Sequence, residues 1–526
     1  METNYQFKTA TEPWEFEALE RLNHDTFARE IPQHAIRPDG RLQDRFHQEN
    51  HYLVALRGTE VVGMLALRNQ RPFSLDAKVQ DLDRHLPEHR SLCEIRLLAV
   101  KPEHRRPGVF HGLMKLTAQE CIQRGHDLAV ISGSVHQLKL YRHMGFEAFG
   151  PAVGTAEAPY QPMFLRTKVF ISRYRELTEP VNFLPGPVPI SPHVRKAMAQ
   201  PARYHREREF RTGFEEARAR LKALATAPHV QILLGSGTLA NETIAAQLSL
   251  LEGPGLVISN GEFGDRLLEQ ARRWNLQHQI LRCPWGEPLN FQEIETALRE
   301  APRTQWIWAV HGETSTGVLN PLEELKALSR KHGVDLALDC VSTLGAMPLN
   351  LEGVRFAAAT SGKALAAFPG LAIVFHDRPL EPSERLPRYL DLGTWEQADG
   401  TPFTHSSNLV EAMVAALQRF EEASPFETLA QQLKRVRQTC LALGMPILAA
   451  PEHAHPCALT LALPPEITAQ AFGEAALARN IQLGWQSGYL RQRNWIQICL
   501  MVPHSEEELA GLERVVRDVW QELAKP

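Results

Sequence analysis

The stretch that decides the fold is Ala359-Thr360-Ser361-Gly362-Lys363-Ala364-Leu365, in which one lysine follows the apolar run 355–359. A second apolar run, 335–339, ends on the acid Asp339, one strand–helix–strand step before Lys363. Ser315 precedes Asp339 by the same interval. Because a strand and its crossover helix take up such an interval, the spacing predicts that three successive strands end near Ser315, Asp339 and Lys363.

Strands and helices alternate through this half of the chain. The alternation predicts an α/β fold with a mostly parallel sheet covered by helices on both faces. One helix is expected at 321–332, and the expected strands are 231–234, 256–259, 305–310, 336–339 and 371–375. Since ligands of such sheets bind at the carboxyl ends of the strands, Asp339 and Lys363 are candidate site residues.

The chemistry of Lys363 and Asp339 suits pyridoxal phosphate. A desolvated lysine near a cationic ring has a lowered pKa and can form an imine. A buried carboxylate is costly unless it is paired, and a pyridinium nitrogen is a suitable partner that keeps the ring protonated. Two plainer interpretations stay open: Asp339 caps the following helix, or Lys363 is a surface lysine in a turn.

The turn Gly235-Ser236-Gly237-Thr238 lies between an expected strand and a helix that begins near Leu239. Its backbone N–H groups, two hydroxyls and small residues suit a phosphate, although such a turn alone is a weak indication. Phe263 follows the next strand, in Asn260-Gly261-Glu262-Phe263-Gly264, and can stack on a flat ring at the same edge. By itself, such a phenylalanine is more often a core residue.

Residues from about 180 to 526 resemble the class V aminotransferases of PLP fold type I, the aspartate-aminotransferase-like fold, and in particular the alanine–glyoxylate, serine–pyruvate and 2-aminoethylphosphonate–pyruvate transaminases. The stretches that carry the resemblance are Phe183-Leu184-Pro185-Gly186-Pro187, His205-Arg206 with Glu209-Phe210, 235–238, Asn260-Gly261 with Gly264, 311–317, 339–345, Lys363 and Pro369-Gly370. The cysteine-desulfurase and kynureninase branches usually have a His before the lysine. Gly362 stands there, which argues against both branches.

The resemblance implies how the cofactor is held. Pyridoxal 5'-phosphate would be bound covalently at Lys363 as a Schiff base, and Asp339 would pair with the pyridinium nitrogen. Phe263 would stack on the ring, where the family usually has Trp or Tyr. Ser315 would lie near the ring hydroxyl.

The resemblance also implies the phosphate site and the assembly. Ser236, Gly237 and Thr238 would hold the phosphate. Thr404 belongs to a stretch, 402–408, similar to the segment that such dimers lend to the neighbouring subunit's cofactor phosphate, so a homodimer with shared sites is implied. Arg206 is expected on the substrate side, with a small-molecule amino donor and an oxo acceptor.

One position departs from the family pattern. These transaminases usually carry an arginine in a C-terminal strand, where it clamps the substrate α-carboxylate bidentately. In Ile496-Gln497-Ile498-Cys499 a glutamine stands at that place, and Gln497 cannot make a charged clamp. Either Arg491 or Arg493, on the approach to the strand, substitutes for it, or the amino substrate lacks the usual α-carboxylate geometry.

The sequence pattern of residues 1–168 predicts a separate α/β unit. Its expected helix is 110–125, and its expected strands are 51–56, 61–67, 95–100 and 127–132. Arg105, Arg106 and Gly108 lie in a basic turn between a strand and that helix. Backbone amides at a helix start, together with two arginines, suit a pyrophosphate.

This unit resembles the GNAT acyltransferases, whose acyl-CoA loop reads Arg/Gln-x-x-Gly-x-Gly/Ala. Phe110 occupies the last small position, which puts the close approach of a phosphate in doubt. The strand Cys93–Val100 is similar to the N-acyl amino acid synthase and acyl-homoserine-lactone synthase branch. An acyl-CoA or acyl-carrier protein is therefore implied as acyl donor.

Two residues of this unit are candidates for acid–base chemistry. Tyr141, near a Gly turn, is a candidate general acid for the leaving thiolate, and Glu94 is a candidate base for the accepting amine. The plainer interpretations are that Tyr141 packs under the turn and that Glu94 is a surface charge at a sheet edge.

With 526 residues, the chain is too long for one ordinary domain. We expect a GNAT-like domain at 1–168, a linker at 169–180, a large cofactor-binding domain at 181–430 and a small α+β domain at 431–526. The helix 429–443 and the strands 458–462 and 496–500 indicate the small domain.

Composition and charge exclude several classes of protein. Hydrophobic residues make up 44% and charged residues 22%, which is globular, and a net charge of -4 indicates no nucleic-acid partner. The dispersed cysteines favour a reducing compartment, and no metal site is expected. Since the sequence shows neither a signal peptide nor an apolar run long enough to span a membrane, it predicts a cytoplasmic protein.

Three functions fit these observations. The first is a bifunctional enzyme that makes an amine by transamination and then acylates it, which raises the effective concentration of the intermediate. The second keeps the aminotransferase and makes the GNAT-like domain a non-catalytic, effector-binding or dimerising module. The third is a non-catalytic scaffold, which the pairing of Lys363 with Asp339 argues against.

Overall fold

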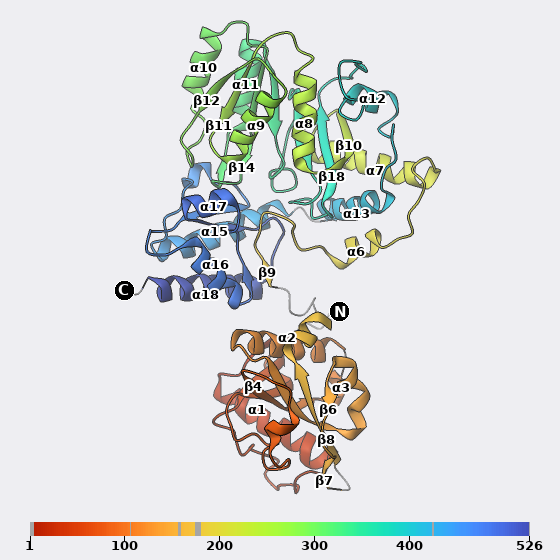
Figure 1. Ribbon diagram of the computed structural model, residues 1–526, viewed down its shortest axis with the longest axis vertical. Helices are drawn as coiled ribbons and strands as arrows, with labels where there is room; N and C mark the ends of the chain where they lie inside the picture. Colours follow the sequence, from red (N-terminus) through yellow and green to blue (C-terminus); the bar gives the residue numbers. More distant parts are fainter. Residues whose placement is uncertain (1–4, 106, 156–158, 174–179, 423–424, 525–526) are drawn as a thin grey trace. The chain divides into compact units, whose positions relative to one another are not determined.

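The computed structural model describes residues 5–105, 107–155, 159–173, 180–422 and 425–524 (Figure 1). The chain divides into two compact units, one formed by residues up to 180 and the other by nearly all of the residues that follow. Of the linker predicted at 169–180, residues 169–173 continue helix α4 (Thr167–Arg173), and 174–179 lie outside the described residues.

The first unit is built on one mixed sheet with the strand order β1-β2-β3-β4-β5-β8-β6, and β7 pairs with β8. The strands are β1 (Gln6–Thr9), β2 (His51–Arg57), β3 (Glu60–Arg68), β4 (Leu92–Val100), β5 (Leu128–Ser134), β6 (Glu147–Ala148), β7 (Val153–Gly154) and β8 (Pro159–Arg166). The longer helices are α1 (Pro13–His24), α2 (Pro107–Gln123), α3 (Leu138–Met144) and α4, and the short helical turns are η1 (Asp25–Glu30), η2 (Leu82–His85), η3 (Pro102–His104) and η4 (Val135–Gln137).

Strand β4 separates from its neighbour part-way along its length. β4 and β5 pair in parallel through Leu92, Cys93 and Glu94 only. Farther along β4, Leu97 has a φ of 53°, a left-handed conformation that leucine rarely adopts. The sheet therefore opens between β4 and β5 beyond Glu94.

The second unit contains a seven-stranded sheet with the order β10-β18-β17-β16-β13-β11-β12. Only β18 runs antiparallel to its neighbours, so the predicted mostly parallel sheet is confirmed. The strands are β10 (His229–Gly235), β11 (Gly255–Ser259), β12 (His278–Arg282), β13 (Trp306–Val310), β16 (Asp335–Asp339), β17 (Phe356–Thr360) and β18 (Gly370–His376). A hairpin, β14 (Gly312–Glu313) and β15 (Val318–Leu319), follows β13.

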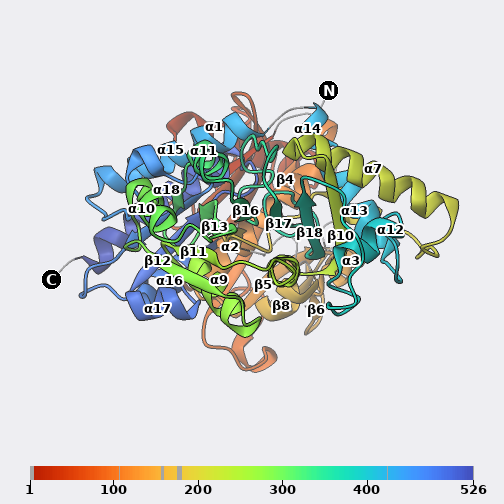
Figure 2. The same cartoon turned by 90° about the horizontal axis from the view of Figure 1, so that it is seen from above.

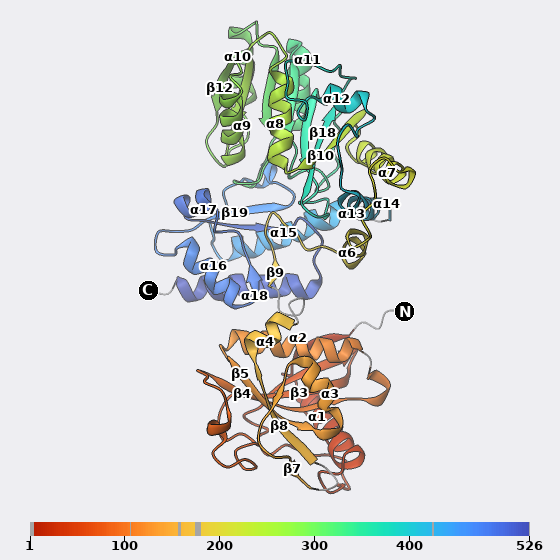
Figure 3. The same cartoon turned by 45° about the vertical axis from the view of Figure 1, so that its right-hand side comes forward.

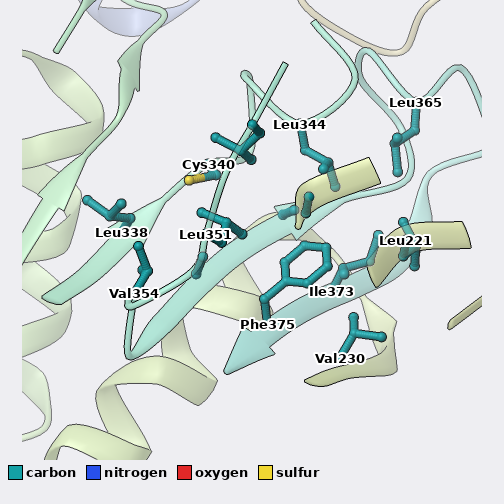
Figure 4. Packing of buried hydrophobic residues seen from close by; sticks show 14 of the residues in the cluster. Leu221, Val230, Leu338, Cys340, Leu344, Leu351, Val354, Leu365, Ile373 and Phe375 are labelled. Atoms are coloured by element: carbon teal, nitrogen blue, oxygen red, sulfur yellow. The ribbon is translucent and has the colours of Figure 1, made fainter. Parts of the chain in front are cut away.

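Helices cover both faces of this sheet (Figure 2). One face packs against α8 (Gly237–Leu248), α9 (Glu262–Arg273) and α12 (Leu392–Gln397). The other packs against α6 (Pro192–Met198), α7 (Arg208–Ala225), α10 (Phe291–Glu300), α11 (Leu322–His332) and α13 (Ser407–Leu417), which is followed by α14 (Arg419–Glu422). In β16, Leu336 and Leu338 face one core while Ala337 faces the other, as the period of a strand requires. Figure 4 shows part of the core on the side of Leu338, to which Ile373 and Phe375 also belong.

A smaller layer follows in sequence (Figure 3). It consists of α15 (Phe426–Ala442), η5 (Pro451–His453), β19 (Ala458–Ala462), α16 (Ala469–Ala478), β20 (Ile481–Gln482), α17 (Gly488–Arg493), β21 (Trp495–Cys499) and α18 (Glu506–Leu523). β20 pairs in parallel with β9 (Val181–Asn182), so the start of this unit joins its end. The layer has a hydrophobic core of its own, to which Phe183 also belongs.

Candidate active site

The carboxyl edge of the large sheet brings together the residues predicted for the cofactor. β16 ends at Asp339, and the turn that holds Lys363 follows the end of β17. Asp339 is the register partner of Ala358 in β17, two residues before that strand ends. Gly235 ends β10 opposite Gly370 of β18, and α8 begins two residues later.

Asp339 is a buried carboxylate held by two hydrogen bonds. It accepts from the Val341 N–H at 2.9 Å and from the Asn241 side-chain amide at 2.7 Å. Burial raises the pKa of Asp339, and these hydrogen bonds and the charge of Lys363 oppose that rise. Asn241, on α8, was not predicted from the sequence, and its Oδ1 has no partner among the described residues.

Lys363 faces the same space. Burial lowers the pKa of Lys363, and the charge of Asp339 works against that shift. The Lys363 Nζ lies 5.1 Å from the centre of the Phe263 ring, and the ring of Tyr489 lies edge-on to Phe263 at 6.5 Å. The structure therefore brings the predicted lysine, acid and aromatic ring to one edge of the sheet.

The turn after β10 is shaped for close approach. Ser236 is the N-cap of α8, yet its side chain makes no capping hydrogen bond, and both Ser236 and Thr238 are exposed. A Cβ on Gly237 would lie 2.9 Å from the Val341 side chain, so this position accepts only a glycine without rearrangement. Two hydroxyls and the N-terminus of a twelve-residue helix are thus presented beside Asp339.

The prediction that Ser315 ends a strand is wrong. β13 ends at Val310, and Ser315 lies in the loop between β14 and β15. Its Oγ donates to Glu313 at 2.5 Å and accepts from the Glu262 N–H at 3.1 Å. The hydroxyl is thereby tied to the start of α9, and its proximity to a ring hydroxyl stays a prediction.

Glu313 is a fully buried acid that the sequence reasoning did not single out. It accepts hydrogen bonds from the N–H groups of Phe263 and Gly264, at 3.4 and 3.0 Å, and so caps α9. Burial raises the pKa of Glu313 to about 7, although four hydrogen bonds favour its ionised form. The sequence offered one indication of Glu313, because it lies in the stretch 311–317 that carries the family resemblance. Glu313 therefore positions the helix that carries Phe263.

Gln497, at the place of the expected arginine, is buried and bonded to its own neighbours. Its amide donates to the Thr314 carbonyl and to the Thr460 hydroxyl. Arg491 and Arg493 are exposed on α17, and the Arg493 guanidinium lies 3.8 Å from the centre of the Trp285 ring. That Arg491 or Arg493 replaces the clamp stays a prediction.

Arg266, which was not predicted, is a cation near the ring site. Its guanidinium lies 5.0 Å from the centre of the Phe263 ring and pairs with Glu262 at 3.0 Å. Its positive charge contributes to lowering the pKa of Lys363 and opposes the rise in the pKa of Asp339. Arg206 and Thr404 are exposed, and their expected roles toward a substrate and a partner subunit stay predictions.

In the first unit, one arginine of the basic turn already bonds to neighbouring residues of the same unit. Arg105 donates to Glu30 at 2.7 Å and to the Val100 carbonyl at 2.9 Å, and the pairing with Glu30 raises the pKa of Arg105. Arg106 lies outside the described residues, and Gly108 is exposed with open space around its Cβ position. A pyrophosphate at this turn would compete with Glu30 for Arg105.

Tyr141 is half-buried on α3, and burial raises the pKa of its phenol. A Cβ on Gly133 would lie 2.9 Å from its ring, so β5 and the ring are in close contact. The alternative that Glu94 is a surface charge is wrong, since its side chain is fully buried. Glu94 accepts from the N–H groups of Ser74 and Leu75, at 2.7 and 3.2 Å, and holds that loop.

Comparisons with known proteins match both units. Residues 192–396 match the family model described as aminotransferase class-V, and residues 18–166 match the one described as N-acyl amino acid synthase FeeM. The chain is 34% identical over 301 residues to the soluble hydrogenase 42 kDa subunit of Anabaena cylindrica, covering 53% of this chain and 78% of that protein. It is 29% identical over 261 residues to a 2-aminoethylphosphonate–pyruvate transaminase of Pseudomonas putida, covering 46% of this chain and 69% of that protein.

A solved structure agrees with the fold. The alanine–glyoxylate aminotransferase of Nostoc sp. superposes with a TM-score of 0.58 at 25% identity, covering 65% of this chain and 95% of that chain. The similarity concerns the fold of the second unit, which is PLP fold type I. Across the described ranges, no helix has both the length and the apolar character needed to cross a membrane. The match to the family model, the share of the relatives' length that the chain covers, and the shared fold lead to one conclusion. The chain is an enzyme that belongs to the class-V aminotransferase family.

Proposed function

We propose that residues 181–526 use pyridoxal phosphate to move an amino group from an amino acid or aminoalkyl compound to a 2-oxo acid or aldehyde. The observation that carries the proposal is the meeting, at one sheet edge, of the buried carboxylate of Asp339 with the lysine of lowered pKa, Lys363. The cofactor supplies an electron sink when it is bound, and the chain binds and aims it.

The residues at this edge fit the cofactor. Burial makes the ionised form of Asp339 costly, and a cationic ring nitrogen would stabilise it. Asn241 orients the same carboxylate through its amide N–H. The Phe263 ring offers a flat surface near Lys363, and the close packing at Gly237 leaves bare backbone for a phosphate.

Each residue then has a definite task. The lowered pKa of Lys363 makes its neutral amine accessible, so that Nζ can bond to the cofactor and later take up and return a proton. Asp339 would hold a proton on the ring nitrogen, and Phe263 would cover one ring face. Ser236 and Thr238 would bind the phosphate with the first N–H groups of α8.

We also propose that the amino donor is recognised by an anionic group other than an α-carboxylate. Gln497 is neutral and already bonded to Thr314 and Thr460, which supports this proposal. Arg266 is a cation whose charge acts on Lys363. The relatives that act on 2-aminoethylphosphonate suggest a donor whose amine and anion are separated by an alkyl chain.

A donor screen tests this proposal. Purified protein with bound cofactor is mixed with L-alanine, 2-aminoethylphosphonate or a simple alkylamine, and loss of the cofactor's visible absorbance band is followed. We expect the anionic aminoalkyl compound to react best and Arg266→Gln to raise its KM about tenfold, since one charged contact is worth roughly 1.4 kcal/mol. Arg273→Gln, on the same helix and paired with Glu269, is the matched control. Efficient reaction with L-alanine alone would overturn the proposal.

For the first unit we propose N-acylation of an amine, with acyl-CoA or an acyl-carrier protein as donor. The match of residues 18–166 and the opening between β4 and β5 support it. The alternative is a non-catalytic module, which the engagement of Arg105 and Glu94 within the unit favours. Release of the carrier thiol in the presence of candidate amines separates the two, because only the first predicts turnover that falls in Tyr141→Phe.

We further propose that the protein works as a cytoplasmic homodimer. Thr404 is exposed, as a residue lent to a partner's phosphate site must be, and the seven cysteines are all unpaired and buried. Mixing Lys363→Ala subunits with Thr404→Val subunits tests shared sites. Recovery of activity in the mixture, above that of either variant alone, is the expected result. A protein that stays monomeric by light scattering would contradict it.

A further inference from the structure

Two histidines and a glutamate form a cluster on the second unit's sheet. His229 begins β10, His376 ends β18, and the two are direct register partners in an antiparallel pair. Side chains of such partners lie on the same face of a sheet, and these two imidazole rings stack with their centres 4.9 Å apart. Glu396, on α12, completes the group, and one ligand atom from each residue lies within 4.8 Å of the others.

The carboxylate of Glu396 contacts one nitrogen of each ring. Its two oxygens are 3.2 Å from Nδ1 of His229 and 3.2 Å from Nε2 of His376. Trp395 and Leu392 anchor α12 in the core beneath, which fixes where Glu396 stands.

Further contacts orient these side chains. Nδ1 of His376 lies 2.9 Å from the Arg378 carbonyl, an acceptor, so this nitrogen carries a proton and Nε2 is the nitrogen left to bind a metal ion. The buried amide of Gln231 donates to Glu396 at 2.6 Å, and its own Oε1 has no partner among the described residues. Outer contacts of this kind are typical of metal sites, where they fix the tautomer and direction of the ligands.

We propose that His229, His376 and Glu396 bind a divalent metal ion of the zinc class. Imidazole and carboxylate ligands suit Zn²⁺ and its first-row neighbours and do not favour Mg²⁺ or Ca²⁺. His229 and Glu396 keep side-chain exposures of 25% and 23%, so the ion can enter from solvent and keep a water ligand. The ion would bind α12 to the ends of β10 and β18.

The role of this ion is structural. His229 is the first residue of β10, whereas the phosphate turn follows the last residue of the same strand. Seven strand residues, at roughly 3.3 Å each, place the metal about 20 Å from that turn. The metal site is therefore separate from the cofactor site, and its loss leaves the cofactor's absorbance band in place.

Titration of the metal-stripped full chain with ZnCl₂ tests the proposal by calorimetry. We expect a single zinc site per chain that His229→Gln and Glu396→Gln each weaken by more than about tenfold. Glu396→Gln keeps an oxygen to accept from Gln231 and so preserves the fold. His278→Gln, at the start of β12, is the control and should bind zinc as the natural chain does.

Two further measurements make the outcome decisive. Co²⁺ in place of Zn²⁺ should give the strong visible bands of a four- or five-coordinate nitrogen and oxygen site, and zinc should raise the Tm of the natural chain but not that of Glu396→Gln. Failure of the natural chain to bind zinc, or unchanged binding in both variants, overturns the proposal. The cluster would then be a polar contact among the three side chains with no metal-binding role.

Discussion

Asp339 and Lys363 have pKa values that burial moves in opposite directions, upward for the acid and downward for the amine. Each shift favours the neutral form, so an uncharged pair is what burial alone would produce. A cationic ring nitrogen paired with Asp339 would reverse the preference of that acid for its neutral form and leave the preference of Lys363 for its neutral form unchanged. The two shifts together thus describe a site whose electrostatics are completed by a cofactor.

Replacing Asp339 by asparagine tests this electrostatic role. We expect Asp339→Asn to retain the cofactor, because Lys363 and the phosphate turn remain, and to lose activity by about 100-fold or more, since the ring nitrogen is no longer held protonated. Asp335→Asn, at the opposite end of the same strand and paired with Arg378, is the control. Steady-state kinetics check the result, and equal activity of the two variants would remove Asp339 from its assigned role.

Glu313 makes a pH-dependent contribution to stability. Its pKa in the folded chain is about 7, above that of an exposed glutamate, so the folded state keeps a proton that the unfolded state has lost. The stability from this group is present at pH below about 4.5 and is lost as the pH rises to about 7, by roughly 3 kcal/mol.

Chemical denaturation across this pH window measures the effect. The free energy of unfolding of the natural chain, minus that of Glu313→Gln, should fall between pH 4.5 and 7 and level off above it. A difference that is constant or rises with pH would mean that Glu313 is ionised throughout.

At the residue scale, sequence motifs predicted the two residues that we propose to be catalytic, but not the residues that support them. Asp339 ends an apolar run and Lys363 lies in the turn after another, and both runs can be recognised in the sequence. Asn241 and Arg266 are ordinary helix residues, and only the packing of α8 and α9 on the sheet brings them to the site. Because these residues lie within helices and not at strand ends, the positions of the strand ends do not predict them.

Helix α9 carries Phe263 and lies unusually close to β11. A Cβ on Gly264 would be 2.7 Å from the Ser259 Cα, and backbone cannot yield as a flexible side chain does. We expect Gly264→Ala to destabilise the chain by about 1–3 kcal/mol and, by displacing Phe263, to weaken cofactor binding.

Gly213→Ala is the matched substitution, because Gly213 lies within α7 and has open space at its Cβ position. It should stabilise the chain by about 0.5–1 kcal/mol, as alanine does in a helix interior. Urea denaturation and cofactor titration compare the two variants. If Gly264→Ala were as stable as Gly213→Ala, the close contact would not exist.

At the element scale, burial decided which strands the sequence could predict. The central strands β13, β16 and β18 are buried along nearly their whole length and appear as continuous apolar runs. β12 is an edge strand, with Gln279 and Ile280 exposed, and it was missed because its sequence has no such run. The hairpin of β14 and β15 was missed for another reason: two-residue strands have no period to detect.

The whole molecule combines two compact units whose proposed activities should be separable. We expect Lys363→Ala to abolish amino transfer and leave acyl transfer intact, and Tyr141→Phe to do the reverse, because each residue belongs to one unit. Assays with purified amine and with purified amino donor, run in parallel on both variants, check the expectation. Loss of both activities in either variant would show that the units do not act independently.

Covalent trapping at Lys363 tests the central claim most directly. The protein with bound cofactor is reduced with borohydride, digested and mapped by mass spectrometry. The predicted result is one pyridoxyl group, on the peptide that contains Lys363, and none in Lys363→Ala. A modified lysine elsewhere, such as the buried Lys326 of α11, or no adduct in the natural chain, would contradict the account.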